Sequence, residues 1–103
     1  MKNAHLLLAA AVIVSTSAPA AAQEALAQKS GCLACHAIDK RVVGPAYRDV
    51  AEKYRGDKTA QAKLEKKVKD GGVGVWGDVP MPPNSFVSDA DIKSLVSWVL
   101  SQK

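Results

Sequence analysis

Two cysteines and a histidine occupy the segment CLACH at residues 32–36. Two thiols three residues apart, on one incipient helical turn, can reach the two vinyl groups on one edge of a porphyrin. The imidazole of the next residue can then bind the iron. Cys32 and Cys35 are therefore predicted to form thioethers with one covalently attached haem c, and His36 is predicted to be its proximal iron ligand.

Two other kinds of site use the same residue types. A thiol–disulfide redox pair also has the CxxC spacing, but it usually begins a helix in a βαβ setting, and no segment here shows the alternation typical of strands. A zinc site needs four ligands, whereas the chain after residue 22 offers Cys32, Cys35 and His36 as its only strong ones. Haem attachment is the favoured interpretation. The alternative is an enzyme, a thiol oxidoreductase that uses Cys32 and Cys35.

The opposite face of the iron needs a second ligand. After residue 22 the chain has no histidine besides His36 and no methionine besides Met81. Met81 lies in the segment PMPPN, residues 80–84, where the prolines restrict the backbone. Asn84 can donate an amide hydrogen bond to the thioether sulfur. Met81 is therefore predicted to be the second axial ligand, and the alternative is a methionine that fills a gap or lies on the surface.

Two strong axial ligands leave the iron no open position. This arrangement favours electron transfer over oxygen or peroxide chemistry, so no enzymatic turnover is predicted. A thioether ligand also raises the reduction potential relative to ligation by two histidines. The rival hypothesis is a haem sensor or peroxidase in which Met81 dissociates from the iron.

The rest of the chain must position these side chains, and it is short. Its 103 residues leave room for one domain, and 48% hydrophobic with 23% charged residues is a globular composition. Only 5% of the residues are aromatic, so the polypeptide by itself supplies a thin core. A bound porphyrin would fill that deficit.

The N-terminus has the features of a secretory signal peptide. Lys2 precedes a run of nine apolar residues, 6–14, and Pro19 and three alanines follow before residue 23. This pattern predicts cleavage after Ala22, which leaves a domain at 23–103. Nine apolar residues are too few to cross a hydrocarbon core, which needs about 20.

Helical periodicity recurs along the predicted domain, and no segment has strand character, so the fold class is all-α. Helices are predicted at 24–30, from Pro45 in the first turn to the residue before Gly56, at 59–70, and from the N-cap Ser88 to the C-terminus. Between the last two lies a 17-residue segment, 71–87, with four glycines and three prolines. A loop this long in a small domain is expected to wrap a ligand.

The motifs CLACH, VGPAY, GVWG and PMPPN occur in this order. With them, residues 24–103 closely resemble the short bacterial class I monohaem cytochromes c of the c-551/c-552 type. The resemblance implies the class I cytochrome c fold, with about four to five short helices wrapped around one haem. It also implies that the first and last helices cross and pack through structural residues, namely Leu26, Leu95, Val96 and Val99.

The resemblance assigns further roles around the haem. The carbonyl of Pro45 should accept a hydrogen bond from Nδ1–H of His36, and the indole N–H of Trp76 should donate to a haem propionate. Lys67 stands where relatives often place a basic residue, commonly arginine, near a propionate. The ammonium of lysine is a compact charge and lacks the planar set of N–H donors of arginine. The contact of Lys67 with a propionate is therefore expected to be less well defined.

Lysines and arginines exceed acidic residues by 14 to 10. The cations crowd the third predicted helix and flank CLACH, at Lys58, Lys63, Lys66, Lys67, Lys69, Lys29, Lys40 and Arg41. This charge is either a field that steers docking to an acidic redox partner or a solvated helix face. It is too modest and too interleaved with acids for nucleic-acid binding.

The resemblance implies a monomeric, peripheral electron carrier in the periplasm, active in respiration and denitrification. Family analogues take electrons from a membrane cytochrome bc complex and pass them to nitrite reductase, a terminal oxidase or a peroxidase. Electrons are expected to leave through the haem edge near the thioethers. The apolar docking patch predicted there consists of Leu33, Ala34, Val43 and Ala46.

Overall fold

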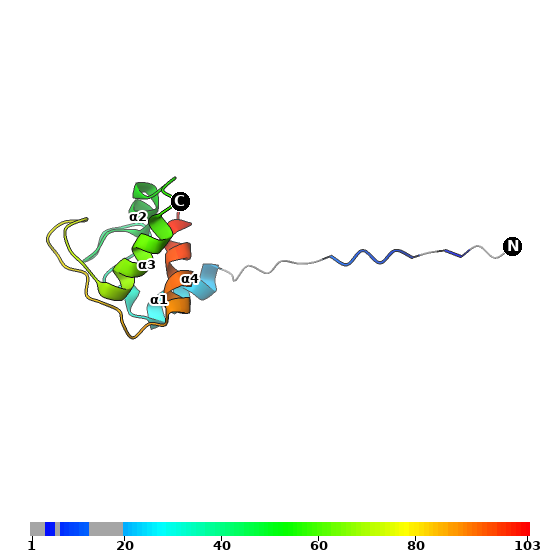
Figure 1. Cartoon of the computed structure of the whole chain (residues 1–103), viewed down its shortest axis with the longest axis horizontal. Coiled ribbons are helices and arrows are strands. Elements are labelled where there is room, and N and C mark those ends of the chain that lie inside the picture. The colour runs from blue at the N-terminus through cyan, green and yellow to red at the C-terminus, as the bar shows by residue number, and fades with distance from the viewer. Residues whose placement is uncertain (1–3, 6, 13–19) are drawn as a thin grey trace.

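The computed structural model describes residues 4, 5, 7–12 and 20–103, and the predicted signal peptide at 1–22 falls partly outside them. The described residues form four α-helices and one short 3-10 helix, without a β-strand. These elements are α1 (Ala20–Lys29), η1 (Cys32–Ala34), α2 (Tyr47–Lys53), α3 (Ala60–Asp70) and α4 (Asp89–Leu100) (Figure 1). The all-α prediction is confirmed. No helix in the described ranges has the length and apolarity to cross a membrane.

The first helix starts earlier than predicted, at Ala20 instead of residue 24. Alanine has the highest helix propensity of all residues, so the three alanines at 20–22 extend the helix toward the N-terminus. The chain leaves α1 through Gly31, whose φ of 82° lies in the left-handed region that glycine adopts without strain. This turn leads directly into the cysteine segment.

The second helix begins at Tyr47, so the prediction that Pro45 occupies its first turn is wrong. The N–H groups of Tyr47 and Arg48 donate to the carbonyls of Ala37 and Ile38, over 2.9 and 3.0 Å. The free amides of the first helical turn thus find partners in the segment that follows CLACH, and no capping side chain is needed. The start of α2 is therefore tied to the cysteine segment.

The two later helices begin close to their predicted positions. Before α3, the carboxylate of Asp57 accepts hydrogen bonds from the N–H and the hydroxyl of Thr59, over 2.8 and 2.6 Å. Before α4, the hydroxyl of Ser88 accepts from the N–H of Asp91 over 3.2 Å, which confirms the predicted N-cap. The last helix ends at Leu100, just short of the C-terminus.

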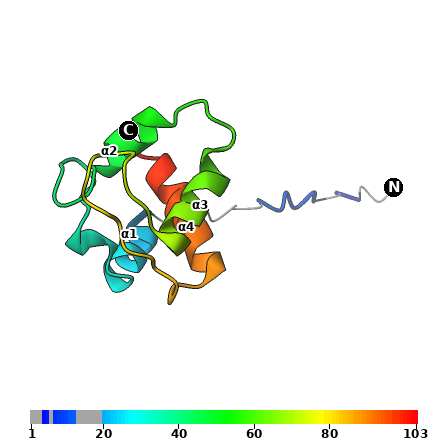
Figure 2. The ribbon, with the colours of Figure 1, turned by 60° about the vertical axis from the view of Figure 1, so that its left-hand side comes forward.

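The core lies where the last helix meets the other three. Helix α4 contacts α1, α2 and α3, and Figure 2 shows it crossing behind α3. Of its predicted packing residues, Leu95 and Val96 are buried and Val99 is half-buried. Ile92 and Trp98 are buried on this helix as well. The core cluster consists of Ala27, Tyr47, Val87, Ile92, Leu95, Val96 and Trp98. Complete burial of Ala27 agrees with the predicted packing of the first helix on the last.

Candidate haem site

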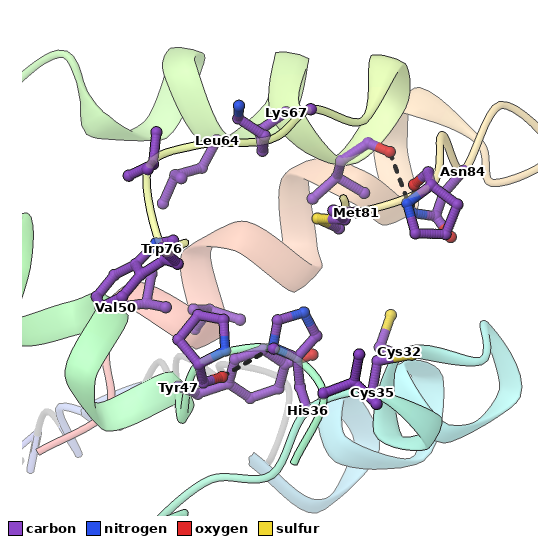
Figure 3. A pocket seen from close by; sticks show the side chains of 18 of the residues that line it. Cys32, Cys35, His36, Tyr47, Val50, Leu64, Lys67, Trp76, Met81 and Asn84 are labelled. Carbon is purple, nitrogen blue, oxygen red and sulfur yellow. Dashed lines mark hydrogen bonds between the residues drawn. The ribbon is translucent and has the colours of Figure 1, made fainter. Parts of the chain in front are cut away.

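One cavity brings the predicted site residues together. Residues 71–87, which we call the 71–87 loop, form one wall, and residues from η1 to α2 form the opposite one (Figure 3). The predicted residues that line it are Cys32, Cys35, His36, Pro45, Lys67, Trp76, Met81 and Asn84. Most of the remaining lining is aliphatic, so the cavity suits a large apolar ligand that carries a few polar groups.

On one side of the cavity the backbone of CLACH folds into a tight turn. The N–H groups of Cys35 and His36 both donate to the carbonyl of Cys32, over 3.2 and 3.0 Å. This turn points both cysteine side chains and the imidazole toward the cavity (Figure 3). Burial raises the pKa of the Cys32 thiol, and contact with the Tyr47 side chain partly opposes this shift. The thiols are free of any disulfide.

The imidazole of His36 is held by the next segment of the chain. Its Nδ1 lies 2.8 Å from the carbonyl oxygen of Pro45. Because that carbonyl can only accept, Nδ1 carries the proton and Nε2 keeps a lone pair for a metal. Gly44 lies against the ring, and a Cβ built there would be 2.5 Å from Cε1 of His36. A side chain at position 44 would therefore displace the imidazole.

Tyr47 is a contact of His36 that the sequence analysis missed. The two rings are stacked, with centroids 5.0 Å apart and planes inclined by 21°. Tyr47 in turn makes an edge-to-face contact with Trp98, with ring centroids 5.5 Å apart and planes inclined by 75°. Tyr47 belongs to the motif VGPAY, but helical periodicity alone does not predict a contact between this residue and His36.

On the other side of the cavity, the 71–87 loop doubles back and pairs with itself. Met81 donates its N–H to the carbonyl of Gly72 over 2.8 Å, and Gly72 donates to the carbonyl of Met81 over 3.0 Å. Gly71 has a φ of 72°, and a Cβ there would lie 2.5 Å from the Met81 carbonyl oxygen. Only glycine meets both demands at position 71. The Met81 side chain faces His36 across the cavity (Figure 3).

The amide of Asn84 has different partners from the one predicted. It was expected to donate to the Met81 sulfur, but Nδ2 donates to the carbonyls of Val68 and Pro82, both over 3.2 Å. The backbone N–H of Asn84 also donates to Val68, over 3.0 Å. Carbonyl oxygens are stronger acceptors than a thioether, which explains the preference. Asn84 thus fastens the 71–87 loop to α3 beside Met81.

Trp76 and Lys67 both line the cavity. Arg41 donates to the carbonyl of Trp76 over 3.2 Å, and Nζ of Lys53 lies 5.6 Å from the centroid of the indole ring. The ammonium of Lys67 lies close over Gly72. Arg41 and Lys53 are far from Trp76 in the chain, so no local sequence pattern predicts these two contacts.

The predicted docking patch is only partly on the surface. Ala34 and Val43 are exposed, Val43 by 47%, and Leu33 is half-buried. Ala46, however, is only 2% exposed, so its assignment to the patch is wrong. It immediately precedes α2.

Several lysines of α3 have acidic partners. Nζ of Lys63 lies 3.3 Å from Asp57, Nζ of Lys66 lies 3.3 Å from Asp70, and Nζ of Lys69 lies 2.9 Å from Asp89. These pairs are partly or fully exposed and add little stability. They do weaken the positive field of the helix, which favours the interpretation of a solvated face.

Comparisons with known proteins agree with this site. The sequence model of the family described as Cytochrome c matches residues 20–103. Cytochrome c-551 of Allochromatium vinosum is 62% identical over 86 residues, which cover 82% of this chain and 92% of the relative. Cytochrome c-552 of Nitrosomonas europaea is 47% identical over 103 residues, with both chains covered completely.

The fold also matches that of a solved structure. The crystal structure of wild-type Nitrosomonas europaea cytochrome c552 superposes with a TM-score of 0.76 at 50% identity, and covers 78% of this chain and 99% of its own. The match of sequence, fold and cavity is consistent over the whole helical domain. The chain therefore belongs to the cytochrome c family, as a short class I member of the c-551/c-552 type, a monohaem electron carrier with one covalently attached haem c.

Proposed function

We propose that the protein is a periplasmic one-electron carrier whose haem iron is bound by His36 and Met81. The observation that carries this proposal is their placement: the two side chains come from segments far apart in sequence and face each other across one apolar cavity (Figure 3). Cys32 and Cys35 lie at the same cavity and are the proposed thioether residues. The haem supplies the one-electron couple, and the chain supplies its ligands and its dry environment.

The residues around the proposed ligands keep them in place. Pro45 fixes the tautomer of His36, and the backbone pair between Gly72 and Met81 holds the thioether side of the cavity. Because both proposed ligands are held in place, their geometry should change little between the two oxidation states of the iron. The reorganisation energy of electron transfer is then small. We propose that Trp76 and Lys67 contact the propionates, and that Asn84 acts by anchoring the loop.

We propose that residues 1–22 are a cleaved signal peptide and that residues 23–103 form the working domain. The support for this proposal is the sequence of the segment, in which Lys2, nine apolar residues and three alanines precede residue 23. Cleavage after Ala22 would also remove the first residues of α1, which lie on its exposed end.

The partners of this carrier are redox proteins. We propose a membrane cytochrome bc complex as the donor and nitrite reductase, a terminal oxidase or a peroxidase as the acceptor, in respiration and denitrification. The carrier would work as a monomer and bind the membrane complex only peripherally. The exposed part of the predicted patch, with Val43 at its centre, is the proposed contact surface.

One optical experiment tests the ligand assignment. The reduced-minus-oxidised spectrum of the purified holoprotein should show a low-spin c-type haem, and the ferric protein should show the weak near-infrared band of a methionine–iron bond. Purified protein without a Soret band would indicate a thiol oxidoreductase instead. A ferrous protein that readily binds carbon monoxide at neutral pH would indicate a sensor or peroxidase with a dissociating Met81.

The contact surface makes a separate prediction. Replacing Val43 by aspartate or lysine should slow reduction by the partner several-fold, because a charge must then be desolvated at the interface. Val43 lines the cavity but is 47% exposed and is not a proposed iron ligand, so the haem spectrum should stay the same. Stopped-flow kinetics would measure the rate, with Ser97→Asp on the exposed side of α4 as a control. Unchanged kinetics in both Val43 variants would remove this residue from the interface.

A further inference from the structure

The proximal histidine has three neighbours that restrain its ring in different ways. The carbonyl of Pro45 holds Nδ1 at 2.8 Å, the backbone of Gly44 lies against Cε1, and the ring of Tyr47 is stacked on the imidazole at 5.0 Å and 21°. A hydrogen bond along one edge fixes a distance but still permits the ring to turn about the line of that bond. A stacked ring removes this remaining freedom, because the imidazole would have to push the neighbouring ring aside.

Tyr47 can act in this way only if it is itself rigid. Its residue is just 6% exposed and begins α2, where its N–H donates to the carbonyl of Ala37. The edge of Trp98, 3% exposed on α4, meets the Tyr47 ring at 5.5 Å and 75°. Aromatic pairs of this edge-to-face geometry are attractive beyond simple burial. A contiguous series of rings thus leads from α4 to the imidazole.

We propose that Tyr47 is the positioning residue of the proximal ligand, with Trp98 as its support, and that these two rings set the plane of the His36 imidazole at the iron. The inference rests on the proposed ligation by His36. It goes beyond that ligation, since it names the residues that determine how the ligand is turned and connects that orientation to the packing of α2 on α4.

The orientation of an axial imidazole has a direct spectroscopic signature. In the ferric low-spin state, the orientations of the axial ligands, among them the plane of the imidazole, determine how unpaired spin is distributed over the porphyrin. They thereby set the spacing of the haem-methyl proton resonances and the spread of the g values. A mutation that only loosens the core lowers the melting temperature but leaves this signature in place. The signature therefore separates positioning from general stability.

The experiment compares ferric holoprotein variants by proton NMR and electron paramagnetic resonance. Tyr47→Leu removes the stacked ring and should change the haem-methyl spacing and the g values. Tyr47→Phe keeps the ring and should leave both unchanged. Trp98→Leu removes the support and should shift the resonances in the same direction as Tyr47→Leu, by a smaller amount.

Two features make the test specific. Tyr47 lines the cavity, so its replacement also alters the wall, but Trp98 does not line it and acts only through Tyr47. Ile92→Ala is the matched control, because Ile92 is 2% exposed in the same core cluster and lies away from the cavity. It should lower the melting temperature without changing the resonance pattern.

The outcomes are distinguishable. If Tyr47→Leu does not retain haem, the comparison of Trp98→Leu with Ile92→Ala decides. A resonance pattern in Trp98→Leu that matches Ile92→Ala and the unmodified protein would overturn the inference, and so would a Tyr47→Phe variant that changes as much as Tyr47→Leu. If the unmodified protein itself lacks the low-spin signature, the proposed ligation fails instead.

Discussion

Replacing Cys32 and Cys35 together by alanine will leave the chain largely unfolded. Both thiols lie at the cavity, so the double variant loses the covalent attachment that holds haem in place. The polypeptide alone has a thin core, since four of its buried hydrophobic residues are alanines, at positions 27, 46, 51 and 60. A core in a domain of this size supplies only about 3–5 kcal/mol.

Loss of haem should lower the stability of the fold further, because residues of the cavity wall lose their packing partner. The loop valines Val73, Val75 and Val79 line the cavity. Each buried aliphatic side chain contributes about 1.5–3 kcal/mol relative to its exposed form. Haem bound in the cavity would bury these side chains, so loss of its attachment removes this contribution to the stability of the fold as well.

Far-UV circular dichroism and thermal melting would measure the result. The double variant should show a weak helical signal and no cooperative melt near that of the holoprotein. The single variants Cys32→Ala and Cys35→Ala are the controls, because each keeps one thioether and both proposed axial ligands. A double variant with native-like helix content and a cooperative transition would show that the aliphatic core suffices without haem.

Replacing Met81 by alanine should convert the protein from an electron carrier to a ligand-binding haem protein. The backbone pair between Gly72 and Met81 does not depend on the side chain, so the 71–87 loop should keep its course. The sixth position of the iron would then be open. The ferrous variant should bind carbon monoxide fully, whereas the unmodified protein should resist it.

The reduction potential should fall at the same time. A thioether ligand favours ferrous iron, so its loss lowers the potential. The variant Met81→His supplies a second imidazole and should remain low-spin. Its potential should be lower by on the order of 0.1 V, within the roughly 0.8 V that axial ligation spans. Loss of the near-infrared band and a spectroelectrochemical titration would measure both effects. Val79→Ala, elsewhere in the cavity wall, is the control. A Met81→Ala protein that keeps the band and excludes carbon monoxide would contradict the assignment.

The chemistry of the site could be predicted because its residues are local in sequence or unique. CLACH is a continuous segment, and Met81 is the single methionine after residue 22. The helices were likewise predictable, because their periodicity and caps, such as Ser88 at α4, depend on neighbours a few residues away. The error at the start of α2 arose because distant carbonyls, those of Ala37 and Ile38, replace a local cap.

The sequence by itself thus determined which atoms are available for haem attachment and iron binding, and that the fold is helical. Only the tertiary structure decided what surrounds those atoms. It directed Asn84 to the carbonyl of Val68, enclosed Ala46, and stacked Tyr47 between His36 and Trp98. These contacts join residues remote in the chain, and they depend on how α2, α3 and α4 pack, which no local pattern of residue types encodes.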